Sequence, residues 1–366
     1  FFEGRDLTDD EAYKHLLEKY SIQHEIFYTK LKSEDYKEKA RYEFALCEQL
    51  KVTGYPCLFL QTSESKFYLV ARGYTKYEEV KTRIENILAE PSRKNTAPCI
   101  AYISFKLAQK DPEATFIVAP SDHLILEEDN FQKIVENALD FVSNIKALVT
   151  LGIKPSNPNT GYGYIQYEGL EVAKGVFKVK TFTEKPNLEI AQSFLDSGDF
   201  LWNAGIFAWK VSTILTAFEK NQPEMYELFD QEKQHFNTPE EAKAIQKIYP
   251  QCTNISIDIA IMEKADNVFV IPSSFGWSDL GTWNSAYDNI EKDYFGNAVA
   301  SDNVIVIDAT KCMINAPKDK LVVVQGLDDF IVVDTKDVLL ICSKEKEQSI
   351  KEYVAEVKRH KGDKYI

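Results

Sequence analysis

The sequence predicts an α/β fold in which strands and helices alternate, with a smaller β-rich region at its C-terminal end. Three patterns along the 366 residues lead to this prediction. From about residue 89, short apolar runs alternate with amphipathic stretches, which is typical of βα units in a mixed sheet with flanking helices. Before that point the order is helix, hairpin and helix. After residue 303, four apolar runs follow at close intervals, as expected of a module built from short strands.

Residues 1–88 are predicted to form a separate N-terminal segment. Thr8 and Thr75 each precede a glutamate by three residues, an arrangement in which the two side chains satisfy each other's backbone donors at the start of a helix. The elements expected between these two positions are a helix after Ser33 that ends near Leu50, and strands over 57–60 and 67–70.

This order of elements resembles the C-terminal half of DsbA-like thioredoxin-fold proteins, with Tyr55 and Pro56 at the position of their cis-proline loop. The resemblance implies a partial thioredoxin-like segment. Thioredoxin chemistry needs a C-x-x-C pair at a helix N-terminus, where the pKa of a thiol is lowered. The six cysteines contain no such pair, so we expect no disulfide-reductase activity.

Residues 89–300 are expected to form the main α/β domain. A helix should begin at Asp129, and another should end before Gly198. Thr238, Pro239 and Glu241 have the order of an N-cap, a first-turn proline and a capping box, which predicts a third helix. The expected strands cover 115–120, 148–153 and 176–182.

Residues 301–366 are expected to form a β-rich module that ends in a helix over 347–360. Its strands are expected over 303–307, 321–324, 330–333 and 338–341. Such an appendage would serve packing or subunit contact, so we expect a homodimer through this module.

Composition excludes several classes of protein. The 43 basic and 57 acidic residues give a net charge of −14, which disfavours binding to nucleic acid. No apolar run reaches the roughly 18 residues of a membrane helix, and no secretory leader opens the sequence, so we expect a cytoplasmic protein. The unpaired cysteines fit a reducing compartment. Because the first residue is Phe1 rather than methionine, the sequence is expected to begin partway through a longer chain or after processing.

Six motifs occur in order between residues 90 and 283. They read E-P-S-R-K-N-T-A-P (90–98), V-A-P-S-D-H (118–123), I-K-P-S-N-P-N-T-G-Y-G-Y-I (153–165), F-T-E-K-P (182–186), L-W-N-A-G-I-F (201–207) and F-G-W-S-D-L-G-T-W (275–283). Together they resemble the mannose-1-phosphate guanylyltransferases, or GDP-mannose pyrophosphorylases, from about residue 85 to the C-terminus. The resemblance implies a nucleotidyltransferase-type, Rossmann-like domain that converts GTP and mannose 1-phosphate to GDP-mannose and pyrophosphate.

The resemblance assigns a magnesium site to Asp122 and Asp279. Asp122 directly follows a predicted buried strand, at the carboxyl edge where ligands bind in open α/β sheets. Mg²⁺ takes one or two protein carboxylates and leaves its other positions to phosphate oxygens and water. That chemistry suits an in-line displacement at phosphorus, which depends on positioning and charge neutralisation.

The remaining expected site residues contact the substrates. Lys185 is expected to pair with the phosphate of the sugar and to act with Asp122 and Asp279 in catalysis. The resemblance assigns the sugar side of the site to Gly163, Glu184, Lys185 and Asn203, and the nucleotide side to Asn95 and Thr96.

The sequence also departs from the family. Guanylyltransferases carry a glycine-rich loop, G-G-x-G-T-R-L-W-P, that cradles the triphosphate, and this sequence has no such motif. The thioredoxin-like segment stands in that place and joins the rest at residues 85–88. We therefore expect guanylyl transfer to be weak or absent. Two alternatives stay open, namely a non-catalytic remnant that binds a sugar phosphate or GDP-mannose, and a thioredoxin-like protein without a redox motif.

Overall fold

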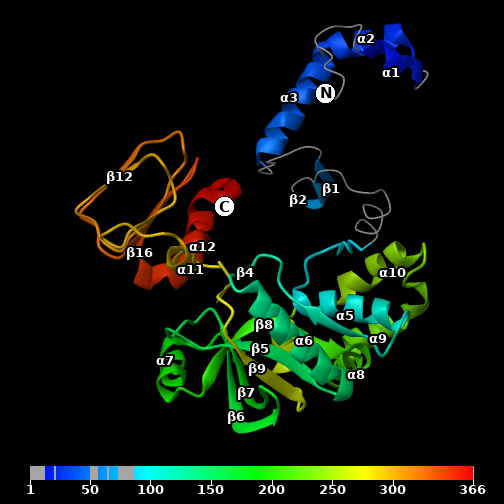
Figure 1. Ribbon diagram of the computed structural model, residues 1–366, viewed down its shortest axis with the longest axis vertical. Helices are drawn as coiled ribbons and strands as arrows, with labels where there is room; N and C mark the ends of the chain where they lie inside the picture. The colour runs from blue at the N-terminus through cyan, green and yellow to red at the C-terminus, as the bar shows by residue number, and fades with distance from the viewer. Residues whose placement is uncertain (1–12, 20–21, 50–56, 64–65, 73–85, 366) are drawn as a thin grey trace. The chain divides into compact units, whose positions relative to one another are not determined.

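The computed structural model describes residues 13–19, 22–49, 57–63, 66–72 and 86–365, and it divides the chain into two compact units (Figure 1). The units are Phe1–Ala89 and Glu90–Ile366. This division lies close to the boundary expected at residues 88 and 89. The capping boxes expected at Thr8 and Thr75 fall outside the described residues.

The N-terminal unit contains the helix and the hairpin that the sequence predicts. A helix runs from Glu34 to Gln49 (α3), after Ser33 as expected. Strands β1 and β2 pair in antiparallel fashion over two stretches that contain the predicted ones. The other elements of this unit are α1 (Lys14–Lys19) and α2 (His24–Lys32), and the hairpin strands are β1 (Cys57–Ser63) and β2 (Lys66–Arg72). That this unit is thioredoxin-like stays a prediction.

A six-stranded mixed sheet forms the centre of the second unit and confirms the predicted α/β class. Its strand order is β3-β8-β5-β9-β7-β6, in which β5 and β9 are parallel and the other neighbours antiparallel. The bounds of β5 are the predicted ones. The strands are β3 (Thr115–Val118), β5 (Leu148–Ile153), β6 (Gly163–Ala173), β7 (Val176–Glu184), β8 (Phe200–Lys210) and β9 (Val268–Ser273).

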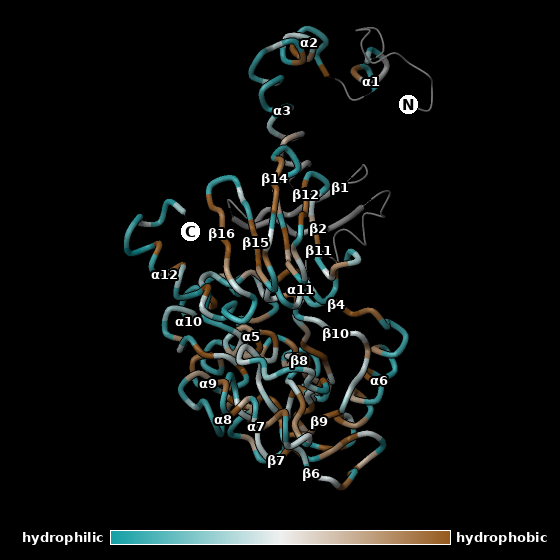
Figure 2. Tube along the Cα trace, turned by 90° about the vertical axis from the view of Figure 1, so that its left-hand side faces the viewer, coloured by the Kyte–Doolittle hydropathy of each residue, from teal (hydrophilic) through white to brown (hydrophobic). Residues whose placement is uncertain are grey.

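Helices lie on both sides of this sheet, and Figure 2 shows α5, α8 and α9 on one side of the strands and α6 on the other. The amphipathic helix α6 buries Ala138 and Val142 against apolar strand residues such as Val149 and Ile206. Helix α7 stops at Gly198, whose φ of 75° provides the left-handed C-cap expected there. The α-helices between residues 90 and 282 are α5 (Thr96–Ala108), α6 (Glu128–Asn144), α7 (Leu188–Ser197), α8 (Val211–Asn221), α9 (Pro223–Asp230) and α10 (Glu241–Ile248).

The capping box predicted at Thr238 is wrong. Helix α10 begins at Glu241 with Glu240 as its N-cap residue, and no side chain caps it. The hydroxyl of Thr238 donates to the carbonyl of His235 at 2.6 Å and accepts from the backbone N–H of Glu240 at 3.2 Å, but it makes no reciprocal bond with Glu241. The carboxylate of Glu241 accepts hydrogen bonds from the Tyr102 hydroxyl, from Lys106 Nζ at 2.7 Å and from a backbone N–H. A long-range network thus uses the carboxylate that local spacing assigns to the cap.

Replacing Glu241 by alanine is expected to lower the free energy of unfolding by about 3 kcal/mol, because a partly buried ammonium and a hydroxyl lose their partner. Both members of the Lys106–Glu241 ion pair are shielded, with side-chain exposures of 17% and 13%. Urea unfolding would measure the change. The exposed neighbour Glu240 gives the matched control, since Glu240→Ala should cost less than about 0.5 kcal/mol. Equal losses in the two variants would contradict the role given to the network.

The C-terminal module is built from short strands, as the sequence predicts. Strands β12 and β14 form a two-stranded parallel sheet. A second sheet has the order β11-β13-β15-β16, in which β11, β13 and β15 are parallel and β16 pairs with β15 in antiparallel fashion. The last helix starts at Ile350 rather than at residue 347, because residues 344–349 form a 3₁₀-helix. The elements are α11 (Trp283–Asn289), β11 (Ala298–Val299), β12 (Val304–Ile307), β13 (Met313–Asn315), β14 (Val322–Gln325), β15 (Phe330–Asp334), β16 (Leu339–Ser343) and α12 (Ile350–Lys361).

Nowhere in the described ranges does a helix have the length and apolar character needed to cross a membrane.

Candidate active site

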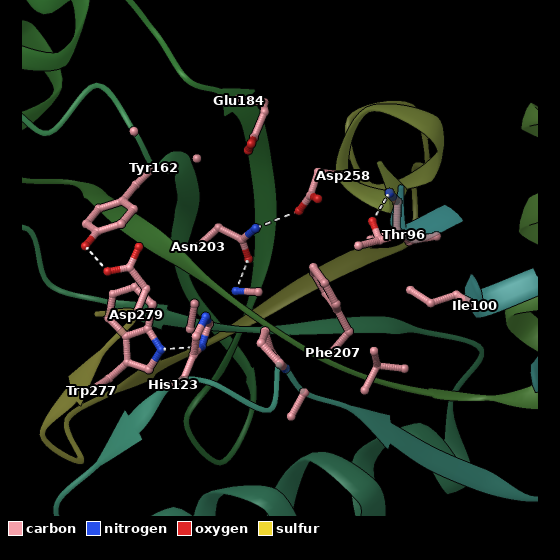
Figure 3. A pocket seen from close by; sticks show the side chains of 18 of the residues that line it. Thr96, Ile100, His123, Tyr162, Glu184, Asn203, Phe207, Asp258, Trp277 and Asp279 are labelled. Carbon is pink, nitrogen blue, oxygen red and sulfur yellow. Dashed lines mark hydrogen bonds between the residues drawn. The ribbon is translucent and has the colours of Figure 1, made fainter. Parts of the chain in front are cut away.

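A cavity of about 400 Å³ opens beside the strands that carry the motifs (Figure 3). Five of the predicted site residues line it, together with side chains that the sequence analysis did not select. The predicted ones are Thr96, Gly163, Glu184, Asn203 and Asp279. Asn95, Asp122 and Lys185 are not part of its wall.

Asn203 reaches the cavity because strand β8 is irregular there. The register between β5 and β8 shifts from Thr150 opposite Phe207 to Gly152 opposite Asn203, and Gly205 within this stretch has a φ of 68°. Such bulges are common beside functional sites, where they redirect a side chain.

The amide of Asn203 is fixed by its hydrogen bonds. Its Oδ1 accepts from the Thr150 hydroxyl at 2.8 Å and from the backbone N–H of Gly205 at 3.1 Å, and its Nδ2 donates to Asp258 Oδ1 at 2.8 Å. An amide nitrogen carries two hydrogens, so one N–H of Asn203 remains for a ligand.

Asp258 is a functional residue that the sequence analysis missed. It lies at the start of a single π-helical turn, Asp258–Met262, and lines the cavity (Figure 3). Burial, followed by the negative charge of Glu184, raises the pKa of this carboxyl to about 6. The signal that would have selected it is a single carboxylate inside the apolar run I-S-I-D-I-A-I-M at 255–262.

Close approach explains the glycine at position 163. A Cβ at Gly163 would lie 2.6 Å from Glu184 Oε2 and 3.3 Å from the Cβ of Asn203. Any larger residue would therefore push the carboxylate of Glu184 away from its place in the cavity wall.

Lys185 lies next to Glu184 in sequence but is not part of the cavity wall. Its ammonium pairs with the carboxylate of Glu184, and its side chain is 57% exposed. The backbone of Lys185 has a φ of 48°, a left-handed conformation that is costly for a residue with a Cβ and is often found at functional sites. Its role toward a sugar phosphate stays a prediction.

The residues expected on the nucleotide side begin helix α5. Asn95 adopts a φ of 65° and accepts from the Thr96 N–H at 2.9 Å. The hydroxyl of Thr96 accepts from the backbone N–H of Ile257 at 2.8 Å, which ties the helix to the segment that carries Asp258. In this structure Asn95 therefore caps a helix, and Thr96 alone of the pair faces the cavity.

The segments that carry the two expected metal ligands lie side by side because two distant strands pair. Strand β4 (Leu124–Ile125) pairs in antiparallel fashion with β10 (Trp277–Ser278), so the residue after β10 lies near the residues before β4. Asp122 and Asp279 both raise the pKa of His123, although burial lowers that pKa overall.

His123 and Tyr162 also line the cavity and were also missed (Figure 3). His123 Nδ1 accepts from Trp277 Nε1 at 3.0 Å, and since an indole nitrogen can only donate, the imidazole is held neutral with its proton on Nε2. The hydroxyl of Tyr162 donates to Asp279 Oδ1 at 2.8 Å, and burial followed by the charge of Asp279 raises the pKa of Tyr162.

These residues fit a divalent cation that is shared with phosphate groups. In the part of the chain that the structure describes, no three His, Cys, Asp or Glu side chains form a cluster able to hold a metal ion. Mg²⁺ differs from structural zinc in needing one or two carboxylates, with phosphates and water completing its shell. Asp279 Oδ1 is engaged by Tyr162 and by the Gly281 N–H, which leaves its second oxygen for a cation.

The described fold, a mixed α/β sheet with flanking helices and a cavity lined by residues of the motifs, is that of a nucleotidyl transferase. The family model for nucleotidyl transferases matches residues 50–294, and a second model, the mannose phosphate isomerase/GMP-like β-helix domain, matches residues 302–357. Within that class, the chain belongs to the mannose-1-phosphate guanylyltransferase family. The match of the first model begins earlier than the resemblance seen in the sequence, which starts near residue 85.

Three curated relatives support this assignment. Mannose-1-phosphate guanylyltransferase of Salmonella montevideo is 34% identical over 310 residues, covering 83% of this chain and 64% of the relative. Mannose-1-phosphate guanylyltransferase 2 of Escherichia coli O157:H7 is 32% identical and covers 87% and 67%. The alginate biosynthesis protein AlgA of Pseudomonas syringae pv. tomato is 36% identical and covers 74% and 56%. The chain thus spans about 56–67% of the length of these relatives.

A solved structure shows the same fold. The crystal structure of mannose-1-phosphate geranyltransferase from Thermus thermophilus superposes with a TM-score of 0.65 at 24% identity, covering 77% of this chain and 81% of that one.

Proposed function

We propose that the chain is part of a mannose-1-phosphate guanylyltransferase, with GTP and mannose 1-phosphate as substrates and Mg²⁺ as the metal, and that transfer by these 366 residues is weak because the glycine-rich motif is absent from them. One observation carries this proposal. The cavity brings together Gly163, Glu184, Asn203 and Asp279, which belong to four separate motifs of the family. The names of the curated relatives favour guanylyl transfer over a non-catalytic sugar-phosphate remnant and over a thioredoxin-like function.

The chemistry of the cavity wall suits a phosphorylated sugar. The free N–H of Asn203 would donate to a hydroxyl oxygen, and the carboxylates of Glu184 and Asp258 would accept from hydroxyl groups. Lys185, which already pairs with Glu184, would bind the phosphate at the rim. Asp122 and Asp279 would hold the cation, which neutralises phosphate oxygens when it is bound.

Binding of mannose 1-phosphate, measured by isothermal titration calorimetry in Mg²⁺, tests this proposal. Gly163→Ala should weaken binding by at least tenfold, because its Cβ would displace the carboxylate of Glu184. Gly169→Ala is the matched control: it lies on the same strand, and a Cβ there meets no atom within 4 Å.

Two results would contradict the proposal. One is a wild-type chain that binds no mannose 1-phosphate at millimolar concentration. The other is a Gly163→Ala variant that binds as tightly as Gly169→Ala. Release of pyrophosphate from GTP and mannose 1-phosphate then tests transfer itself.

A homodimer through the C-terminal module also stays a proposal. The apolar side chains of Ile305, Ile307 and Val323 are 45–56% exposed on the paired strands β12 and β14, which is consistent with such a contact.

A further inference from the structure

Helix α11 begins directly after the turn that carries Asp279. Residues 279–282 join strand β10 to this helix, and Leu280 within the turn has a φ of 48°. This left-handed conformation is costly for a residue with a Cβ, and it persists only where the surrounding structure fixes it. The position of Asp279 therefore depends on the contacts that hold the start of α11.

The start of α11 is held by two sets of hydrogen bonds. Thr282 and Ser285 form a capping box within the helix, in which each side chain accepts from the backbone N–H of the other residue. The second contact comes from the C-terminal module, where Glu347 Oε1 accepts from the backbone N–H of Asn284 at 3.0 Å. An N–H in the first turn of a helix has no partner within the helix, so this oxygen satisfies a donor that would otherwise stay free.

Glu347 is itself fixed in place. The residue is only 8% exposed and belongs to the 3₁₀-helix Lys344–Ser349. The side chain of Asn284 donates back to the carbonyl of Lys344 at 3.2 Å, and the ammonium of Lys344 lies 3.6 Å from the centre of the Tyr287 ring in α11. These contacts hold the carboxylate of Glu347 against the first turn of α11.

Glu347 also lies close to the candidate active site. It lines a cavity of about 280 Å³ whose wall includes Tyr162 and Asp279, and these two residues line the first cavity as well. The hydroxyl of Tyr162 donates to Asp279 Oδ1, so the main α/β domain orients this carboxylate from one side. The C-terminal module supports it from the other side, through the start of α11.

We propose that Glu347 is a positioning residue of the active site, which holds the turn 279–282 by fixing the start of α11. The C-terminal module then contributes to cation binding without contacting the cation. The inference rests on the proposed function, in which Asp279 is a metal ligand. Because Glu347 binds a backbone N–H, its role requires an acceptor oxygen at this position rather than a negative charge.

Binding of Mn²⁺ to the full chain, followed by electron paramagnetic resonance in the presence of mannose 1-phosphate, tests the inference. Glu347→Met keeps the approximate size of the side chain but removes its oxygens, and it is expected to weaken Mn²⁺ binding about tenfold. Glu347→Gln keeps an oxygen that can accept from Asn284, and its affinity should stay within about threefold of the wild type. Glu345→Met is the matched control, since Glu345 is exposed on the same 3₁₀-helix and lines neither cavity.

Hydrogen–deuterium exchange of the full chain without added metal gives a second measurement. In Glu347→Met the backbone amides of residues 279–285 should exchange about tenfold faster than in the wild type, because the start of α11 has lost one hydrogen bond. Glu347→Gln and Glu345→Met should exchange as the wild type does.

The outcomes separate this inference from the proposed function. Equal Mn²⁺ affinity in Glu347→Met and Glu345→Met would overturn the inference, and so would unchanged exchange in Glu347→Met. A loss in Glu347→Gln as large as that in Glu347→Met would also overturn it, because the charge would then be responsible. A wild-type chain that binds no Mn²⁺ would overturn the metal assignment of the proposed function, whereas faster exchange in Glu347→Met would still support the role of Glu347 in holding the turn.

Discussion

Replacing Asp258 by asparagine is expected to stabilise the protein and, at the same time, to weaken its binding of mannose 1-phosphate. The pKa of Asp258 rises from its ordinary value of 3.8 to about 6, first through burial and second through the charge of Glu184. Keeping this carboxylate charged at neutral pH therefore costs folding free energy of roughly 2–3 kcal/mol. Asparagine keeps an oxygen that can accept from Asn203 Nδ2 but carries no charge.

The sign of the pH dependence follows from the proton balance. Between about pH 4 and pH 6 the native state holds a proton on Asp258 that the unfolded chain has released, so this group makes stability fall as pH rises through that window. Asp258→Asn should remove this contribution and raise the free energy of unfolding at pH 7 by about 2 kcal/mol. Urea unfolding at pH 4.5, 5.5 and 7 would measure it.

Binding should change in the opposite direction. Loss of a charged acceptor for a sugar hydroxyl is expected to weaken mannose 1-phosphate binding about 10- to 100-fold. Asp266→Asn is the matched control, because the pKa of this exposed carboxyl is lowered by its ion pair with Lys220 and it lies outside the cavity. An Asp258→Asn variant that is destabilised at pH 7 would contradict the expected effect on stability, and one that binds mannose 1-phosphate as the control does would contradict the expected effect on binding.

Asp279→Asn is expected to reduce affinity for a divalent cation by at least 100-fold. Removing a residue that only orients a metal ligand typically lowers metal affinity 10- to 100-fold, so removing a ligand itself should lower it further. Binding of Mn²⁺, followed by electron paramagnetic resonance in the presence of mannose 1-phosphate, would measure it. Asp122→Asn should have a similar effect if the two carboxylates share the ion.

Stability separates the metal role from a structural one. Asparagine at position 279 can still accept from Tyr162 and Gly281, so its thermal transition should stay close to that of the wild type. Asp279→Ala would leave the Tyr162 hydroxyl without a partner and should cost about 1–3 kcal/mol. Asp288→Asn, on the exposed side of α11, is the control that should retain Mn²⁺ binding. Tight Mn²⁺ binding by Asp279→Asn would show that the metal assignment is wrong.

Much of the fold could be predicted because hydrophobic patterns act locally. The bounds of β5, the end of α7 at Gly198 and the close strands of the C-terminal module all agree with the sequence pattern. Strand β8 enters the sequence analysis only as a motif, since a strand whose two faces are both buried is apolar almost throughout and lacks the alternation that marks a half-buried strand. The capping box at Thr238 is wrong because Tyr102 and Lys106, which are distant in sequence, bind the carboxylate of Glu241.

The sequence by itself determined the α/β class, the family and the predicted residues of five motifs that line one cavity. Residue types and their order carry that information. A backbone that approaches a side chain closely requires glycine, as at position 163, and a cation site at the end of a strand requires carboxylates, and both can be recognised in the sequence. Only the tertiary structure decided that Asp258 joins Asn203, that His123 is held neutral by Trp277, and that residues 347–351 lie beside Asp279. These contacts join positions between 55 and 154 residues apart, and burial, which sets the pKa of Asp258, exists only after the chain has folded.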